Sequence, residues 1–246
     1  MPNPLKRMSL ASQAVTALIQ LIEERGLKEN DVLPPTSELA DSLDVSRTVV
    51  REAIAELAGL GLVDRRQGRE TVITLPNSPQ LEQLLHLRFV LQGHDYENLQ
   101  DFREIVEVGS ARLAAAHATD ANIEALELRL AAITTATSED EMHEKDQAFH
   151  TELARASGND MVVLTLDGIT PLLFNLRRRA WQGWARSGQG VDPIIKAHAV
   201  ILDRIRAHDV EGAADAMSAH LAQARHGLQL LPRGTQMDAA HGSAHA

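Results

Sequence analysis

The sequence predicts a mainly α-helical protein of two domains: a small N-terminal domain that ends in a β-hairpin, and a larger antiparallel bundle of helices. Apolar residues recur at helical spacing over most of the chain. Aromatic residues make up only 3 % of the composition while Ala and Leu are common, which favours helices over an aromatic-rich β-sandwich. A chain of 246 residues is long enough for two domains that each bury a core.

The N-terminal domain is expected to span residues 1–75 and to begin with three helices. They cover 9–25, a short segment that starts at Thr36, and 47–58. Thr36 and Ser46 are the expected N-caps, because a hydroxyl oxygen can accept a hydrogen bond from the first free backbone N–H groups of a helix. Gly26 and Gly59 are the expected stops.

A hairpin follows the third helix. The segment 62–75 (LVDRRQGRETVITL) reads as two short strands joined at 67–69. Two short helices joined by a tight turn and followed by a hairpin are the element order of a winged helix-turn-helix. The predicted fold of the first domain is therefore a winged helix-turn-helix with a small β wing.

The second domain is predicted to be all helical. Residues 76–79 form the expected linker, because two prolines so close together resist both helix and strand. The bundle should span 80–231, and Pro171 should kink its fifth helix. The last segment, 232–246, is small and polar and is expected to be disordered. The expected helices are 80–92, 95–117, 120–136, 139–156, 160–185, 193–208 and 210–230.

Composition narrows the class of protein. There is no cysteine, so disulfides and thiolate metal sites are excluded. The N-terminus has no apolar signal core and no apolar run approaches eighteen residues, so we expect a cytoplasmic protein without a membrane partner. The net charge is −10, and the first 75 residues hold nine Lys or Arg against eleven Asp or Glu. An interaction with DNA must therefore rest on where the basic residues lie.

Basic and hydroxyl side chains gather at the start of the third helix and on the hairpin. Arg47 and Arg51, one turn apart, could reach guanine edges in a major groove while neighbouring hydroxyls contact phosphate. A basic wing could contact phosphate or the minor groove. The alternative is that both arginines simply solvate a surface helix. The candidate DNA contacts are Ser46, Arg47, Thr48 and Arg51 on the helix, and Arg66, Gln67 and Gly68 on the wing.

Three histidines and one aspartate are candidate metal ligands. Asp146 and His150 are four residues apart and share a helix face, and His198 and His220 fall on the inner faces of two later helices. Three imidazoles and one carboxylate suit a divalent cation, with zinc as the first choice and nickel or manganese as alternatives. A metal-free, structural role for the four residues is the competing interpretation. His143 is close in sequence but is expected to be exposed to solvent.

Three further residues are candidate contacts for a bound anion. Arg103 could pair with a carboxylate through two hydrogen bonds, or could instead form an ion pair with Glu107 at i, i+4. Trp181 is a candidate pocket wall, with a place in the core as the alternative. Asn175 is a candidate amide partner for ligand hydroxyls.

Two stretches of the chain resemble the GntR family of bacterial transcription regulators. Residues 32–72 resemble its DNA-binding domain through Leu33-Pro34, the segment VSRTVVREAIAELAGLGLV at 45–63, and Gly68. Residues 81–229 resemble the FCD ligand-binding domain of the FadR-type branch. The residues that carry this second resemblance are Arg103, Glu107, Asp146, Phe149, His150, His198 and His220.

The resemblance implies a function. It implies that Arg47, Thr48, Arg51 and Gly68 contact operator DNA, that the Asp and three His hold a divalent ion, and that the protein is a homodimer that binds a small carboxylate. We therefore expect a metabolite-responsive transcription regulator, a repressor, whose effector is a sugar acid, a hydroxy acid or an aromatic acid. The alternative is a metal-dependent hydrolase that uses metal-bound water. A weaker third option is an architectural DNA-binding protein with a purely structural metal.

Overall fold

The computed structural model describes residues 9–65, 70–75, 78–186, 188 and 192–231. The chain divides into two compact units, Met1–Gln80 and Leu81–Ala246. The expected hairpin turn at 67–69 and the expected disordered segment at 232–246 lie outside the described residues. Among the described residues, no helix has both the length and the apolar character needed to cross a bilayer.

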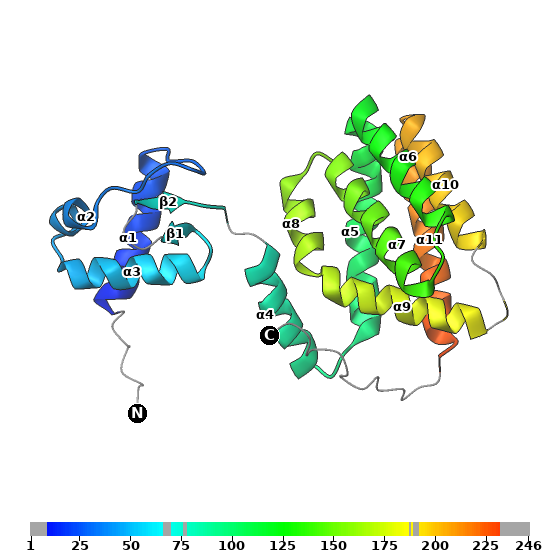
Figure 1. Ribbon diagram of the computed structural model, residues 1–246, viewed down its shortest axis with the longest axis horizontal. Helices are drawn as coiled ribbons and strands as arrows, with labels where there is room; N and C mark the ends of the chain where they lie inside the picture. The colour runs from blue at the N-terminus through cyan, green and yellow to red at the C-terminus, as the bar shows by residue number, and fades with distance from the viewer. Residues whose placement is uncertain (1–8, 66–69, 76–77, 187, 189–191, 232–246) are drawn as a thin grey trace. The chain divides into compact units, whose positions relative to one another are not determined.

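The first unit contains the three predicted helices and the predicted pair of strands (Figure 1). Their bounds are α1 Leu10–Glu24, α2 Thr36–Leu43, α3 Arg47–Gly59, β1 Val63–Arg65 and β2 Thr71–Ile73. The strands are antiparallel, with Val63 opposite Ile73, and Val32 adds a single bridge to Val72. The small sheet is therefore tied to the segment that precedes α2.

The turn between α2 and α3 is short and locally determined. Asp44 ends α2 in the left-handed conformation, with φ 51°. Ser46 then caps α3, because its side-chain oxygen accepts a hydrogen bond from the backbone N–H of Val49 at 3.3 Å. The prediction for α2 was wrong in one detail: Pro35 occupies the N-cap position, Thr36 is already helical, and no side chain caps this helix.

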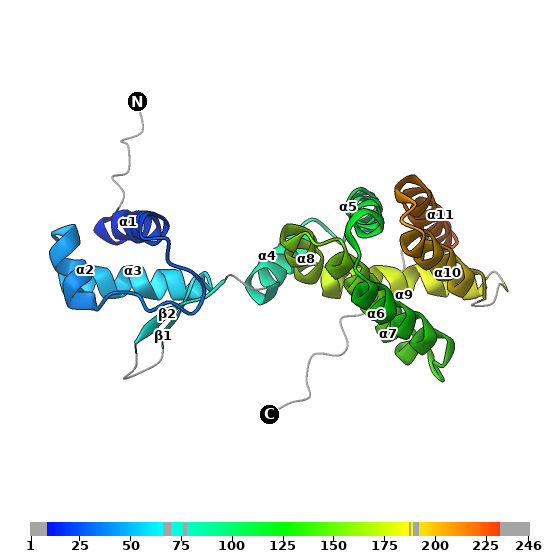
Figure 2. The ribbon, with the colours of Figure 1, turned by 90° about the horizontal axis from the view of Figure 1, so that it is seen from above.

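The second unit is a bundle of eight helices among the described residues (Figure 1). They are α4 Ser78–Leu91, α5 Tyr96–His117, α6 Asp120–Thr134, α7 Glu139–Ala156, α8 Asp160–Gly168, α9 Thr170–Arg186, α10 Asp192–Arg206 and α11 Val210–Gln229. Both views show α6 beside α7, and α11 beside α5 and α10 (Figures 1 and 2). The main apolar core lies between α5, α6, α7, α10 and α11.

Two boundaries differ from those expected. Ser78 and Pro79 belong to α4 and not to a linker, because proline fits the first turn of a helix, where its missing N–H is not needed. The segment expected as one helix kinked at Pro171 is two helices, α8 and α9, with Ile169 between them. Pro171 is the second residue of α9, so it starts a new helix instead of bending an old one.

Helices α9 and α11 cross at two glycines. A Cβ atom on Gly183 would overlap the backbone carbonyl of Gly227, and a Cβ atom on Gly227 would overlap the carbonyl of Ala180. The backbones can approach this closely only because neither residue has a side chain. The crossing matters because Trp181 and Trp184 on α9 flank it.

We predict that Gly183→Ala destabilises the second unit by about 1–3 kcal/mol, because a methyl group forces the two backbones apart. The measurement is thermal or urea unfolding followed by circular dichroism. Gly109→Ala is the matched control: Gly109 is also helical but has open space around it, so alanine should add about 1 kcal/mol of helix propensity. Equal stability of the two variants would contradict this account of the crossing.

Candidate metal centre and nucleic-acid interface

Three buried histidines from three helices meet inside the second unit. His150 lies on α7, His198 on α10 and His220 on α11, and none is more than 5 % exposed. One ring nitrogen of each lies within 4.8 Å of one nitrogen of each other ring. The structure therefore brings together the three imidazoles that helical spacing placed on inner faces.

Close polar contacts surround two of these rings. Nδ1 of His198 lies 2.8 Å from the carbonyl oxygen of Ile194, which can only accept, so Nδ1 carries a hydrogen. Nδ1 of His150 lies 2.5 Å from a carboxylate oxygen of Glu107. Nε2 of His198 lies 3.3 Å from Nε2 of His150 and 3.1 Å from Oδ1 of Asp146. Two imidazole nitrogens and one carboxylate, all of them common metal ligands, thus lie close together.

Asp146 stands at the edge of the three rings. Its Oδ1 lies 3.1 Å from Nε2 of His198, and its Oδ2 lies 4.0 Å from Nε2 of His150. Both ring nitrogens of His220 are buried without a hydrogen-bond partner among the described residues. Orphaned buried nitrogens are costly, and a metal ion is one group that removes this cost. The four residues thus fit the donor set of a divalent ion.

The protonation states of His150, His220 and Asp146 also suit metal binding. Burial lowers the pKa of His150 to about 4, although Glu107 beside it acts the other way. Burial, together with the neighbouring histidines, lowers the pKa of His220 well below its ordinary value. Burial would raise the pKa of Asp146, but the histidines and the guanidinium of Arg177 outweigh it and hold that pKa well below its usual range. At neutral pH these side chains are in the forms that bind metals.

Glu107 orients the centre from outside it. This carboxylate on α5 is 1 % exposed, accepts from Nε of Arg103 at 2.8 Å and from a terminal nitrogen of Arg177 at 2.9 Å, and lies 2.5 Å from Nδ1 of His150. Burial would raise its pKa, but these positive neighbours hold the pKa well below its ordinary value. The predicted i, i+4 ion pair of Arg103 is therefore present. One terminal nitrogen of Arg103 is also buried without a partner among the described residues.

A cavity adjoins the centre. The centres of water-sized molecules can occupy about 40 Å³ of it, within a hollow of about 480 Å³ that includes solvent at its mouth. Its lining residues are Arg103, Met142, His143, Asp146, Arg177, Ala180, Trp181, Trp184, Ile194, His220, Gln223 and Ala224. Arg103 can therefore serve both roles that the sequence left open: it holds Glu107 and also faces the cavity.

Of the three other residues considered near the site, the structure places one as expected and two differently. Trp181 lines the cavity. Asn175 is exposed and does not, because it lies on the face of α9 opposite Arg177 and Trp184. The expectation of an exposed His143 was wrong: it is 3 % exposed, and its ring packs edge-on against Trp181 with centroids 5.8 Å apart.

Sequence reasoning missed Arg177. It pairs with Glu107 and with Asp146, at 3.3 Å, and also hydrogen-bonds to Gln147. The available signal was spacing, since Arg177, Trp181 and Trp184 recur at i, i+4 and i+7 on one face of α9. Within the run of three arginines at 177–179, nothing in the sequence singled out the first as buried.

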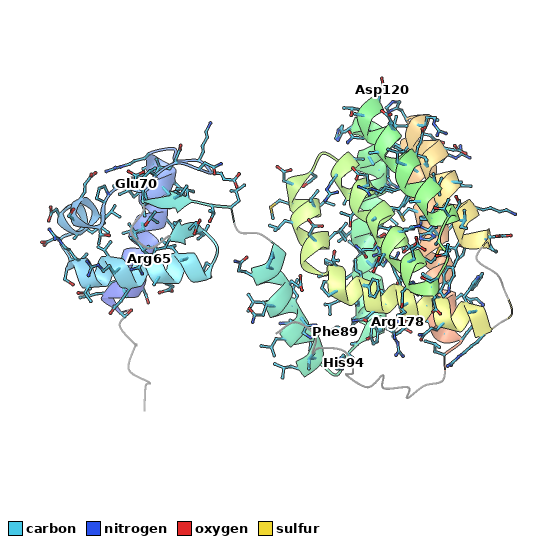
Figure 3. All side chains as sticks on the ribbon, viewed as in Figure 1. Arg65, Glu70, Phe89, His94, Asp120 and Arg178 are labelled. Atoms are coloured by element: carbon cyan, nitrogen blue, oxygen red, sulfur yellow. The ribbon has the colours of Figure 1, made fainter. Side chains whose placement is uncertain are left out.

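In the first unit, the predicted DNA-contacting residues of α3 share one exposed end. Ser46, Arg47, Thr48 and Arg51 are all exposed around its first turn, while Val50 on the opposite side is buried. Arg65 is exposed at the end of β1 (Figure 3). The predicted wing contacts Arg66, Gln67 and Gly68 lie outside the described residues.

Comparison with known proteins identifies the class. A model of bacterial regulatory proteins of the gntR family matches residues 10–73, and an FCD domain model matches residues 98–223. The fold and the matches together define a DNA-binding transcription regulator with a ligand-binding domain. The chain belongs to the GntR family. None of these matches gives support to the hydrolase alternative.

Individual relatives agree with this. The chain is 32 % identical over 203 residues to the HTH-type transcriptional regulator LutR of Bacillus subtilis (strain 168), covering 82 % of this chain and 93 % of LutR. It is 29 % identical over 216 residues to the putative L-lactate dehydrogenase operon regulatory protein of Escherichia coli (strain K12), covering 86 % and 83 %. Among solved structures, Streptococcus agalactiae GntR has a TM-score of 0.64 at 28 % identity, covering 87 % of this chain and 98 % of that one.

The geometry predicts that Glu107→Ala destabilises the second unit by about 3–5 kcal/mol, because it leaves Arg103 and Arg177 buried without their shared carboxylate. Urea unfolding in the presence of a chelator measures this without a contribution from bound metal. Glu104→Ala is the control: Glu104 pairs with Arg225 near the surface, so its loss should cost less than about 1 kcal/mol. Similar losses from both variants would contradict a structural role for Glu107.

Proposed function

We propose that this GntR-family regulator is a metal-dependent sensor of a small carboxylate, and that it acts as a homodimeric repressor in the cytoplasm, where bacterial operator DNA lies. The observation that carries the proposal is the meeting of three buried imidazoles with ring nitrogens within 4.8 Å of one another, one of which, His220, has no hydrogen-bond partner among the described residues. This donor set suits zinc first, with nickel or manganese as alternatives. Asp146, His150, His198 and His220 would hold the ion.

Charge supports an anionic effector. The guanidinium groups of Arg103 and Arg177 are balanced by the carboxylates of Glu107 and Asp146, so a divalent ion leaves the site with two excess positive charges. When bound, the ion supplies a Lewis-acidic positive charge that attracts a carboxylate. Arg103 lines the cavity and would grip that carboxylate with the terminal nitrogen that has no hydrogen-bond partner among the described residues.

The named relatives favour a hydroxy acid. One of them is named for an L-lactate dehydrogenase operon, and lactate is a 2-hydroxy acid. A carboxylate with a neighbouring hydroxyl could chelate an ion that keeps open positions. Sugar acids and aromatic hydroxy acids carry the same pair of oxygens.

A packing route leads from the cavity towards the DNA-binding domain along the chain. Helix α9 lines the cavity with Arg177 and Trp181, and its first turns share an apolar cluster with Leu85 and Phe89 of α4. Helix α4 is the first helix after the winged domain in sequence. An effector that shifts α9 would therefore alter the helix closest in sequence to that domain, and with it the placement of two winged domains on two operator half-sites.

The metal assignment predicts about one divalent ion per chain in the purified protein, and loss of that ion in the double variant His150→Ala/His198→Ala. Elemental analysis after dialysis measures the metal content. The control is His86→Ala/His94→Ala, which removes two exposed imidazoles and should leave the metal content unchanged. Equal metal in the wild type and the first double variant would reject the assignment.

The DNA assignment predicts that Arg47→Ala and Arg51→Ala each weaken specific binding by about 1–3 kcal/mol, as expected for side chains that read bases. Fluorescence anisotropy at fixed salt, with DNA selected from a random pool, measures the affinity. Lys28→Ala removes the same charge elsewhere in the unit and should have a much smaller effect.

The same assay tests the sensor role. A hydroxy acid that raises the melting temperature of the metal-loaded protein should also weaken operator binding, because linkage makes the two effects reciprocal. The metal-free His150→Ala/His198→Ala variant should show neither response. An acid that stabilises the protein yet leaves operator affinity unchanged would refute the sensor, and tighter operator binding would refute the repressor.

A further inference from the structure

The cavity has a charged end and an apolar end. At the charged end lie Arg103, Asp146, Arg177 and His220, each on a different helix. At the other end, two lining side chains are polar, His143 and Gln223, and six are apolar or aromatic. The six are Met142 on α7, Ala180, Trp181 and Trp184 on α9, Ile194 on α10, and Ala224 on α11.

The two ends are separated along the helix axes. On α7, Met142 lies one turn from Asp146, which is about 6 Å at 1.5 Å per residue. On α9, Trp184 lies seven residues from Arg177, or about 10 Å. Three helices repeat the same order, polar residue first and apolar residues one turn further out. A two- or three-carbon acid held at the metal would be too short to reach Trp184 in this outer part.

The aromatic wall is held in place before any ligand binds. The ring of His143 packs edge-on against Trp181 and also against Phe174, with centroids 5.8 Å and 6.0 Å apart. Trp184 is 9 % exposed and packs edge-on against His226 at 5.8 Å. Preorganised aromatic surfaces bind apolar groups with little loss of side-chain entropy.

We infer that the effector is a 2-hydroxy monocarboxylate with an apolar body of about four to eight carbon atoms, aromatic or branched, seated against Trp181 and Trp184. This rests on the proposed function, because the same site would hold the carboxylate head at the metal and Arg103. The apolar wall would select among acids that all carry the same carboxylate and hydroxyl for the metal and Arg103. A sugar acid would place several hydroxyls at an end where only His143 and Gln223 are polar, so most of them would lose their hydrogen bonds to water.

The test compares three acids with the same head and different tails: lactate, phenyllactate and gluconate. Calorimetric titration of the zinc-loaded, full-length protein gives each dissociation constant. Phenyllactate should bind at least about tenfold more tightly than lactate, since each buried methylene is worth about fourfold in affinity. Gluconate should bind no more tightly than lactate, although its tail is also long.

Variants assign the effect to the wall. Trp181→Ala should weaken phenyllactate binding about tenfold more than it weakens lactate binding, with zinc still bound, and Trp181→Phe should retain most of the preference. Leu128→Ala, an exposed apolar residue on α6, is the control and should change neither affinity.

The outcomes separate the two proposals. If lactate or gluconate binds as tightly as phenyllactate, the apolar effector is refuted while a carboxylate sensor stands. If Trp181→Ala weakens lactate and phenyllactate equally, the wall has no part in selecting the tail and the inference fails. If none of the acids binds the zinc-loaded protein, the proposed function and this inference both fail.

Discussion

The buried carboxylate of Glu107 is the constraint on which the second unit depends. A carboxylate that is 1 % exposed is tolerable only beside groups that compensate its charge, and Glu107 lies against Arg103 on its own helix, Arg177 on α9 and His150 on α7. The three partners fix how α5, α7 and α9 are rotated about their axes. A rotation of any one helix would leave at least one buried charge without its partner, so the arrangement specifies a single packing.

The same carboxylate links the fold to the proposed chemistry. Glu107 lies 2.5 Å from Nδ1 of His150 and so directs Nε2 of that ring towards His198, as carboxylate partners of metal-bound histidines commonly do. It also holds Arg103 through one nitrogen, while another nitrogen of Arg103 has no hydrogen-bond partner among the described residues. An anion bound there would share a guanidinium with Glu107. Effector binding would then change the balance of forces on a charge that three helices depend on, which is the differential interaction that a ligand-driven shift requires.

Much of this could be predicted from sequence because it follows from periodicity. The spacing of Asp146 and His150, and the apolar faces around His198 and His220, were enough to place four side chains in one interior. What could not be predicted depends on contacts between distant segments. Arg177 can be buried because it pairs with Glu107, which lies seventy residues earlier in the sequence. His143 is buried because α9 covers it with Trp181, and no local pattern reports which helix covers which face.

The break between α8 and α9 bears on how a ligand in the cavity could affect helix α4. A single kinked helix would tie the cavity wall rigidly to α8, whereas the structure begins a new helix at Thr170. At that break Gly168 lies against Leu81 of α4, so closely that a Cβ atom there would come within 2.7 Å of the leucine side chain. Helix α9 therefore contacts the cavity through its C-terminal half, while the region of its start packs against α4. Because α9 is one uninterrupted helix between these two places, an effector that displaced Trp181 would move the end of α9 that lies near α4 as well.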